Sequence, residues 1–253
     1  MTELADLTIT STAINASGGG AVTDNPALEA WTECYGPGAR YNTYDRHDWP
    51  TGAFDVRREV IKRYSFAIPT DAALDVIAAA GPVVEIGAGT GYWAELLRRR
   101  GCDVAAYDIQ GEDHAKWFPH GLVGQVDVGG IEMAAKHPDR TLLLIWPYMD
   151  SMAHDAATAY AGAGGQRLVY IGEGPWGCTA NDDFFALVGR DCDRDWDDEH
   201  DCSTHPAPAW REVADVAIPQ WDGIHDHLYV YERVDNGHAI APPKSGQNGR
   251  EAQ

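Results

Sequence analysis

Two hydrophobic patterns alternate along the chain from about residue 54 to residue 189. Apolar residues at helical spacing predict helices, whereas short continuous apolar runs bounded by turn residues predict buried strands. The expected helices cover residues 54–66, 69–81, 90–101, 129–138, 151–164 and 181–189. The expected strands cover residues 82–87, 102–108, 121–127, 140–148 and 166–174, and the third is the weakest. Strands that alternate with helices favour a mostly parallel sheet covered on both faces.

The last two apolar runs break this alternation. Residues 210–221 and 226–234 both have the pattern of strands, and they are joined by the short link QWDGIH at residues 220–225. A crossover between parallel strands needs about a dozen residues or more, so these two strands must be antiparallel. The pattern therefore predicts an α/β fold whose mostly parallel sheet ends in an antiparallel hairpin.

The composition changes near both ends of the chain. Residues 1–25 are rich in Thr, Ser, Ala and Gly, and residues 236–253 have the composition of a polar tail, so we expect both segments to be disordered. Residues 26–69 are rich in aromatic side chains and are expected to form an ordered N-terminal cap. Residues 70–235 would then form the core of the fold.

The charge and the cysteine content narrow the range of partners. The formal net charge is −20, with 39 acidic residues against 19 Lys and Arg, which disfavours nucleic acid as a partner. The basic run Arg98-Arg99-Arg100 stands where a helix should end, and cations there complement the helix dipole. The five cysteines are odd in number and scattered, and the sequence shows no signal peptide or membrane span. We expect a cytoplasmic protein without a membrane partner, whose oligomeric state the sequence does not indicate.

The stretch VVEIGAGTGYW, residues 83–93, carries the strongest functional signal. An apolar strand ends near Glu85, and Gly87, Gly89 and Gly91 follow at alternate positions before a helix. Glycines in such a turn permit a tight bend and a close approach of the backbone to a ligand. Asp108 ends the next strand, where an acid can accept hydrogen bonds from ribose hydroxyls. Together these features predict a nucleotide or nucleoside cofactor.

The glycine spacing separates two classes of cofactor. Dinucleotide sites use G-x-G-x-x-G, and the third glycine of that pattern would fall on Tyr92, which disfavours a nucleotide-dependent oxidoreductase. The observed G-x-G-x-G, preceded by Glu85, resembles the first motif of the class I S-adenosylmethionine-dependent methyltransferases, and YDIQ resembles the end of their second strand. The terminal hairpin is also similar to that of their seven-stranded sheet, so the resemblance covers about residues 60–234. It implies a three-layer, Rossmann-like sandwich and S-adenosylmethionine (SAM) as cofactor.

The resemblance also implies roles for individual residues in cofactor binding. Gly87, Ala88 and Gly89, with Gly91 completing the loop, would approach the methionine part, and Glu85 would orient the loop or the bound ammonium group. The remaining implied contacts are Asp108 with the ribose, Ile109 with the adenine face, Asp127 with the adenine amino group, Tyr64 covering the cofactor, and Trp146 beside it.

The segments after the last strands should hold the methyl acceptor. Trp146-Pro147-Tyr148 follows the fourth strand, in the position of the family's fourth motif, but it lacks the polar residue that grips an amino group in nucleic-acid bases. We therefore expect Trp146, Tyr148 and Trp221 to wall a site for a small molecule. His225 is the preferred general base because its ordinary pKa lies near neutral pH, and Glu173 and Asp226 are the other catalytic candidates.

One acidic stretch, residues 191–205, is open to two interpretations. Cys192, His200, Cys202 and His205 could bind zinc, and the dense acids could bind a divalent cation, but no C-x-x-C pair is present. A solvated acidic insertion is the favoured interpretation, and no metal ligand is assigned.

The sequence therefore predicts a methyltransferase that uses SAM and acts on oxygen or nitrogen of a small-molecule or sugar-like acceptor. The acidic surface favours a neutral or cationic acceptor. The alternative is a non-catalytic binding module that retains the same fold.

Overall fold

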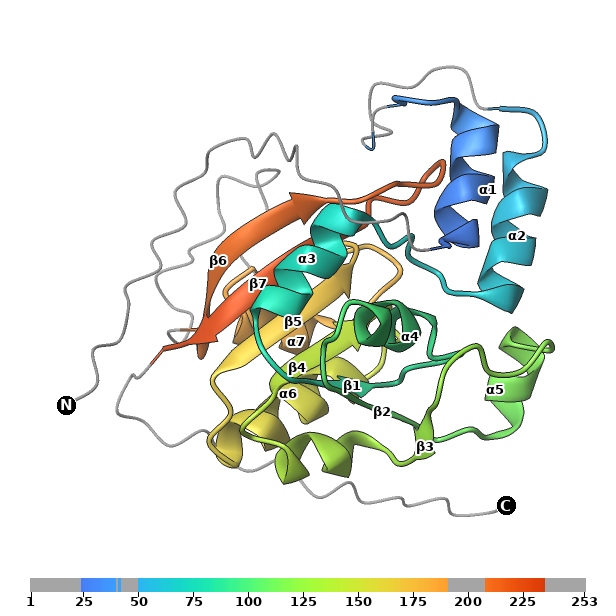
Figure 1. The fold of residues 1–253 in the computed structure, drawn as a ribbon. Coiled ribbons are helices and arrows are strands. Elements are labelled where there is room, and N and C mark those ends of the chain that lie inside the picture. The colour runs from blue at the N-terminus through green and yellow to red at the C-terminus, as the bar shows by residue number, and fades with distance from the viewer. Residues whose placement is uncertain (1–23, 40, 42–49, 191–207, 235–253) are drawn as a thin grey trace, which may run out of the picture.

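A computed structural model describes residues 24–39, 41, 50–190 and 208–234 of the chain. These residues form one seven-stranded sheet with the strand order β3-β2-β1-β4-β5-β7-β6 (Figure 1). The parallel strands are β1 (Val83–Ile86), β2 (Val104–Asp108), β3 (Asp127–Val128), β4 (Thr141–Ile145) and β5 (Arg167–Gly172). The helices and strands that the alternating pattern predicted are thereby largely confirmed, as is the α/β fold class.

The C-terminal hairpin is antiparallel, as its short link required. Strand β7 (His227–Arg233) pairs antiparallel with β5, and β6 (Trp210–Ala217) pairs antiparallel with β7. Strand β6 consequently runs in the direction of the parallel strands. Because Gly172 at the end of β5 pairs with His227 at the start of β7, the β6–β7 turn lies at the carboxyl edge of the sheet. Ligands of open α/β sheets bind at this edge.

Helices cover both faces of the sheet because alternate strand residues point to opposite sides. One face packs Val83 and Leu143 against α3 (Asp71–Ala79) and α4 (Tyr92–Arg99). The other face packs Val84 and Leu142 against α6 (Met152–Gly162) and α7 (Asp182–Leu187), with the 3-10 helix η1 (Ile131–Lys136) beside them. The result is the expected three-layer sandwich.

Three further helices, one of them short, lie at the carboxyl edge of the sheet. Helices α1 (Pro26–Tyr35) and α2 (Ala53–Arg63) lie side by side at the end of the sheet to which β4 and β5 point, and α5 (Glu112–Trp117) lies near the same edge (Figure 1). Helix α1 begins at the cap Asn25, whose side chain accepts a hydrogen bond from the Leu28 N–H at 3.1 Å. The Tyr92 hydroxyl donates to the same Asn25 oxygen at 2.7 Å, which fastens α1 to α4.

Two predicted elements differ from the observed ones. The third strand, expected over residues 121–127, has only two residues, because the segment before it bonds elsewhere: the Val123 and Gly124 N–H groups donate to the Thr90 carbonyl at 2.8 and 3.2 Å. The helix expected over residues 129–138 is a 3-10 helix of six residues, held between a Gly-Gly pair and Pro138. Helix α5 has no counterpart among the elements predicted from the sequence.

The ends of the chain and the acidic stretch 191–205 lie outside the described residues. Of the cysteines, Cys34, Cys102 and Cys178 are described, and all three are free thiols. Every helix in the described part of the chain is too short or too polar to cross a membrane.

Candidate active site

A cavity of about 280 Å³ opens at the carboxyl edge of the sheet. The loop after β1 forms one side of it, and the segment after β4 forms the other. The cavity is lined by Tyr64, Ser65, Phe66, Glu85, Gly87, Ala88, Gly89, Thr90, Tyr92, Trp93, Asp108, Trp117, Phe118, Ile145, Trp146, Pro147, Tyr148, Met152 and Cys178. The structure thus gathers residues from segments that are far apart in the sequence.

The glycine loop forms a narrow cradle. Gly87 and Gly89 have φ angles of 74° and 55°, which side chains with a Cβ rarely adopt. A Cβ on Gly87 would stand 2.6 Å from the Met152 methyl carbon, and one on Gly89 would stand 3.0 Å from the Phe118 ring. The backbone of this loop can therefore approach a ligand more closely than any substituted residue would permit.

Glu85 is a buried carboxyl without a hydrogen-bonding partner. The residue is 2% exposed, and its Oε2 atom accepts no hydrogen bond within the described residues. Burial raises the pKa of Glu85 to about 8; the Arg98 charge opposes this shift, and the Asp108 carboxylate adds to it. An unpartnered buried carboxyl at the rim of a cavity indicates a ligand that brings its own donor or positive charge.

Asp108 fastens the glycine loop. Its Oδ2 accepts from the Gly89 N–H and its Oδ1 from the Gln110 N–H, both at 2.9 Å. One ring nitrogen of His114 lies 2.9 Å from the Gly89 carbonyl and holds the loop from the other side. An ionised carboxylate has about four acceptor positions, so Asp108 retains capacity for ligand hydroxyls.

Three residues predicted to bind the cofactor do not line the cavity. Ile109 is 73% exposed, and Asp127 is exposed on the edge strand β3. Gly91 is the left-handed cap of α4, and a Cβ there would stand 2.6 Å from Val126. Gly91 therefore serves helix packing in this structure, whereas Ile109 and Asp127 are exposed outside the cavity lining.

Aromatic residues that the sequence did not single out line part of the cavity. Trp117 and Phe118, at the end of α5, line the cavity together with Phe66. Phe66 contacts both of them, with ring centroids 5.3 Å from Trp117 and 6.3 Å from Phe118. The adjacent pair Trp117-Phe118, soon after the second strand, was the available sequence signal.

Trp146 has a conformation that the surrounding structure holds in place. Its φ is 49°, a region that is uncommon for residues other than glycine and is concentrated at functional sites. Its ring stacks on Phe66 at 4.7 Å with an interplanar angle of 14°. Its indole Nε1 donates to both carboxyl oxygens of Asp226 at 2.8 Å. Trp146 thus connects the cavity to the β6–β7 turn.

The three catalytic candidates, Glu173, His225 and Asp226, lie close together, and Asp226 is the one that bonds Trp146. Glu173 is buried, and it accepts backbone hydrogen bonds from Cys178 at 2.6 Å and from His225 at 3.0 Å. Burial raises the pKa of the fully buried Asp226 to about 7, and it lowers the pKa of His225 below its ordinary value. Neither Glu173, His225 nor Asp226 lines the cofactor cavity.

The structure separates the residues expected to hold the acceptor. Tyr148 lines the cavity and is 54% exposed, so it stands at the rim. Trp221 is 1% exposed and lies away from this cavity, against Tyr35 of α1 with ring centroids 6.0 Å apart. Trp221 instead borders a second cavity at the end of α2.

The described residues contain no cluster of three or more His, Cys, Asp or Glu side chains that could hold a metal ion. The candidates Cys192, His200, Cys202 and His205 lie outside that part of the chain.

The residues of the cavity fit the cofactor that the glycine loop implies. The unpartnered Glu85 carboxyl matches an ammonium group, and the cradle of Gly87, Ala88 and Gly89 admits a chain against the backbone. Asp108 offers acceptors for hydroxyl groups, and aromatic side chains line the rest of the cavity. This geometry defines a nucleoside-cofactor site at the carboxyl edge of a doubly covered sheet.

Comparison with known proteins identifies the class. A family model described as a methyltransferase domain matches residues 55–156, which include the glycine loop and Trp146. The chain therefore carries a methyltransferase domain in this part of the sequence, and its cofactor is SAM. The predicted enzyme class and cofactor are thereby confirmed. No curated protein matches the chain.

Solved structures with a similar arrangement are distant in sequence. Magnesium protoporphyrin IX methyltransferase from Synechocystis PCC 6803, with bound SAM, is 12% identical, with a TM-score of 0.43, over 82% of this chain and 91% of that chain. The 1,6-didemethyltoxoflavin-N1-methyltransferase of Burkholderia thailandensis is 15% identical, with a TM-score of 0.38, over 65% and 78%. Likenesses at this level do not indicate the acceptor of this chain.

Proposed function

We propose that this methyltransferase acts on a hydroxyl or amino group of a small-molecule acceptor. The observation that carries the proposal is the position of Trp146, which lines the cofactor cavity and donates its indole N–H to the buried Asp226. The acceptor would bind against Trp146 and Tyr148, beyond the cofactor. An aromatic wall suits a planar or sugar-like molecule, and it excludes water from the reacting atoms.

The cofactor would be held by the residues that line the glycine-loop end of the cavity. The backbone from Gly87 to Gly89 and the Glu85 carboxyl would hold its amino-acid part, and Asp108 would accept hydrogen bonds from its ribose. Tyr64, which lies 5.0 Å from the Tyr92 ring, would cover it. When bound, the cofactor supplies an electrophilic methyl group on a sulfonium. Ile109 and Asp127 are not included, because they do not line the cavity.

The protein must then orient the acceptor and accept its proton. Methyl transfer is a displacement that needs the nucleophile in line, so the walls at Trp146 and Tyr148 would supply positioning. Because burial lowers the pKa of His225, its imidazole is neutral at pH 7 and can accept a proton. Asp226 is the second candidate base, since its pKa of about 7 leaves part of it ionised at neutral pH. Glu173 would fix the turn through the His225 N–H.

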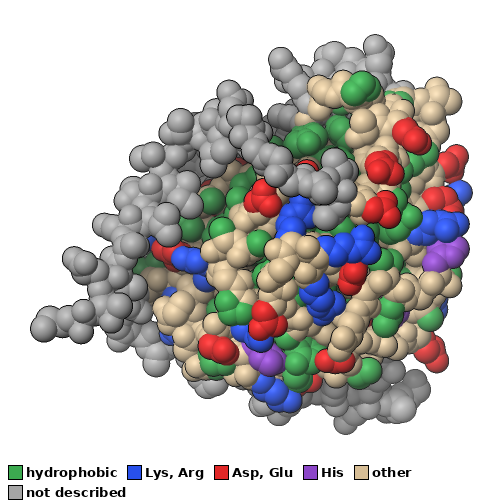
Figure 2. Space-filling model, viewed as in Figure 1, with side chains coloured by type: hydrophobic (Ala, Val, Ile, Leu, Met, Phe, Trp, Pro, Cys, Tyr) green, Lys and Arg blue, Asp and Glu red, His purple; other side chains and the backbone are tan. Residues whose placement is uncertain are grey.

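The basic side chains near the cofactor helix support a small acceptor rather than a nucleic acid. Arg100 contacts Asp71 and Asp75, and Arg99 pairs with Glu95 at 3.0 Å. Arg98 donates to the backbone carbonyls of Val104 and Gln125. On the face seen in Figure 2, Lys and Arg are mixed with Asp and Glu rather than gathered in a continuous band. Nucleic-acid binding relies on Lys and Arg side chains gathered against the phosphates.

The first test is calorimetric titration with SAM and S-adenosylhomocysteine (SAH), with NAD as the control. We expect micromolar binding of the first two and none of NAD. A methyl-release assay on aromatic and sugar-like hydroxyl and amino compounds then tests the acceptor class. Turnover of an oligonucleotide, with none of the small molecules turned over, would refute the proposal.

A further inference from the structure

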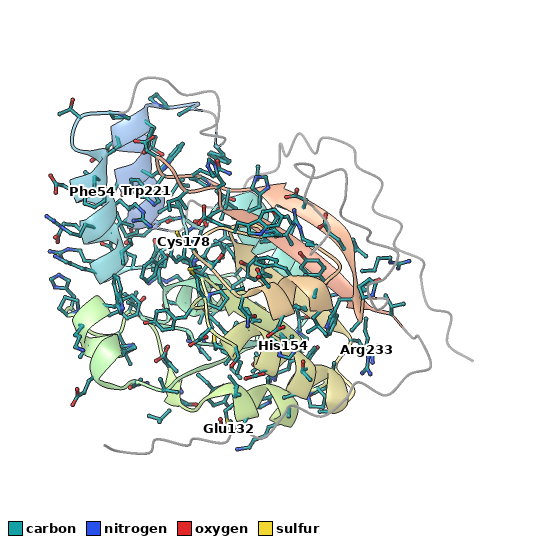
Figure 3. All side chains as sticks on the ribbon, turned by 180° about the vertical axis from the view of Figure 1, so that it is seen from behind. Phe54, Glu132, His154, Cys178, Trp221 and Arg233 are labelled. Atoms are coloured by element: carbon teal, nitrogen blue, oxygen red, sulfur yellow. The ribbon has the colours of Figure 1, made fainter. Side chains whose placement is uncertain are left out.

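A second cavity of about 140 Å³ lies at the N-terminal end of α2, beside the β6–β7 turn. Its lining includes Tyr35, Phe54, Arg57, Trp221 and Asp222. Figure 3 shows Phe54 and Trp221 close together at this end of the molecule, with Cys178 of the cofactor cavity on the side toward the sheet. The cavity is therefore lined by three aromatic rings, one cationic side chain and one carboxylate.

Among the described residues, Arg57 has no counter-ion in contact. It is partly buried, and within the described residues its guanidinium makes no hydrogen bond or ion pair; the Nε atom is shielded from solvent and also lacks an acceptor. Its Cζ lies 5.7 Å from the centroid of the Trp146 ring. Burial lowers the pKa of Arg57, but Asp226, Cys178 and Glu173 oppose this shift, and an arginine keeps its charge under such conditions.

Two of the nearby carboxylates, Asp226 and Glu173, are engaged elsewhere, whereas Asp222 lines the cavity with a buried Oδ1 that accepts no hydrogen bond within the described residues. Both oxygens of Asp226 accept from the indole of Trp146 at 2.8 Å. The oxygens of Glu173 accept the backbone N–H groups of Cys178 and His225. A buried guanidinium donor without an acceptor is costly, so the Arg57 Nε–H indicates an acceptor, such as an anion, from beyond the described residues.

We propose that the second cavity binds a carboxylate group of the methyl acceptor, and that Arg57 is its donor. This inference rests on the proposed function, because Arg57 lies beside Trp146, which itself lines the cofactor cavity. A planar guanidinium offers two parallel N–H donors that match a carboxylate. The rings of Phe54, Trp146 and Trp221 favour an aromatic body for the acceptor.

The preference for an anion differs from the neutral or cationic acceptor that the net charge predicted. Repulsion by the acidic surface acts at long range, and at physiological salt it is screened within about 8 Å. The guanidinium acts at contact distance in a partly buried site, where charge-assisted hydrogen bonds are strong. The local arginine therefore determines affinity, and the net charge mainly affects the rate of encounter.

The test uses a matched pair of probes, 3-hydroxy-2-naphthoate and 3-hydroxy-2-naphthamide, titrated into the full chain saturated with SAH. The carboxylate should bind at least about tenfold more tightly than the amide. Arg57→Gln should remove this preference, and Arg57→Lys should retain part of it. The control is Arg58→Gln, since Arg58 is exposed on the same helix and pairs with Asp55 at 3.1 Å. SAH affinity should stay unchanged in all three variants, because neither arginine lines the cofactor cavity.

The outcomes separate the two proposals. Failure of SAH to bind the wild-type protein would refute the cofactor site and with it the proposed function. If SAH binds, equal affinities for the two probes, binding of neither, or a preference that survives in Arg57→Gln would overturn the role of Arg57 alone.

Discussion

Replacing Glu85 with glutamine should stabilise the cofactor-free protein while weakening its binding of the cofactor. Glu85 is 2% exposed, and burial raises its pKa from the ordinary 4.5 to about 8. The folded protein therefore keeps this carboxyl protonated at pH 7, whereas the unfolded chain releases the proton. Glutamine has nearly the same shape and remains neutral in both states.

The magnitude follows from the difference between the two pKa values. For an acid whose folded pKa is raised, the unfolded state binds fewer protons, so stability falls as the pH rises from the unfolded pKa to the folded one. At about 1.4 kcal/mol per pH unit, the roughly 2.5 units between the ordinary pKa and pH 7 cost about 3 kcal/mol. At pH 5 the cost is below about 1 kcal/mol. Because pH 7 lies below the folded pKa, this figure depends little on the exact folded value.

Urea unfolding of the cofactor-free protein, followed by tryptophan fluorescence at pH 5 and pH 7, measures this difference. We expect Glu85→Gln to raise the free energy of unfolding by about 3 kcal/mol at pH 7 and by less than about 1 kcal/mol at pH 5. The control is Glu95→Gln on α4, which removes a surface pair with Arg99 and should change stability by less than about 1 kcal/mol. An equal gain at both pH values, or a loss at pH 7, would refute the reasoning.

The same variant should lose about tenfold or more in SAH affinity, because the neutral amide cannot pair with the ammonium group. Wild-type affinity should rise between pH 6 and pH 8 as the carboxylate forms, whereas the affinity of the variant should stay flat over that range. A wild-type affinity that does not change with pH would separate Glu85 from ammonium binding.

Three further substitutions test other parts of the site. Gly89→Val should abolish cofactor binding, because its Cβ would stand 3.0 Å from the Phe118 ring at a φ of 55°, whereas Gly162→Val has open space and should bind normally; calorimetry with SAH compares them. Asp108→Ala should weaken SAH binding about tenfold, since it removes ribose acceptors and frees the Gly89 N–H, and unchanged affinity would contradict this role. His225→Ala should lower turnover about 100-fold while SAH affinity is retained, and equal losses in both would indicate a structural role.

Much of the cofactor site follows from local sequence. Gly87 and Gly89 adopt left-handed φ angles that few other residues tolerate, so their spacing fixes the turn wherever the fold places it. Glu85 and Asp108 come at the ends of strands whose apolar runs are readable from the sequence, and parallel strands bring such ends to one edge. The short link before β7 likewise left the antiparallel pairing as the only geometry.

The residues at the borders of the site could not be placed in this way. Ile109 follows β2 and Asp127 begins β3, but the segment before β3 bonds to the Thr90 carbonyl instead of extending the sheet, and neither side chain lines the cavity. Trp221 belongs to the predicted turn, yet it packs against Tyr35 of the N-terminal region. Such positions depend on contacts between segments distant in the chain, and hydrophobic periodicity does not reveal these contacts.

The sequence by itself determined most of the alternation of strands and helices along the chain, the antiparallel ending and the glycine cradle, because each depends on periodicity, loop length or the conformational freedom of one residue. Only the tertiary structure decided that Arg57 of α2 stands beside Trp146 of the fourth strand's loop, with no counter-ion in the described part of the chain, and that Trp146 bonds Asp226. Burial and charge pairing arise where separate segments meet. They determine the pKa values and the unpartnered polar atoms on which the chemistry of this site depends.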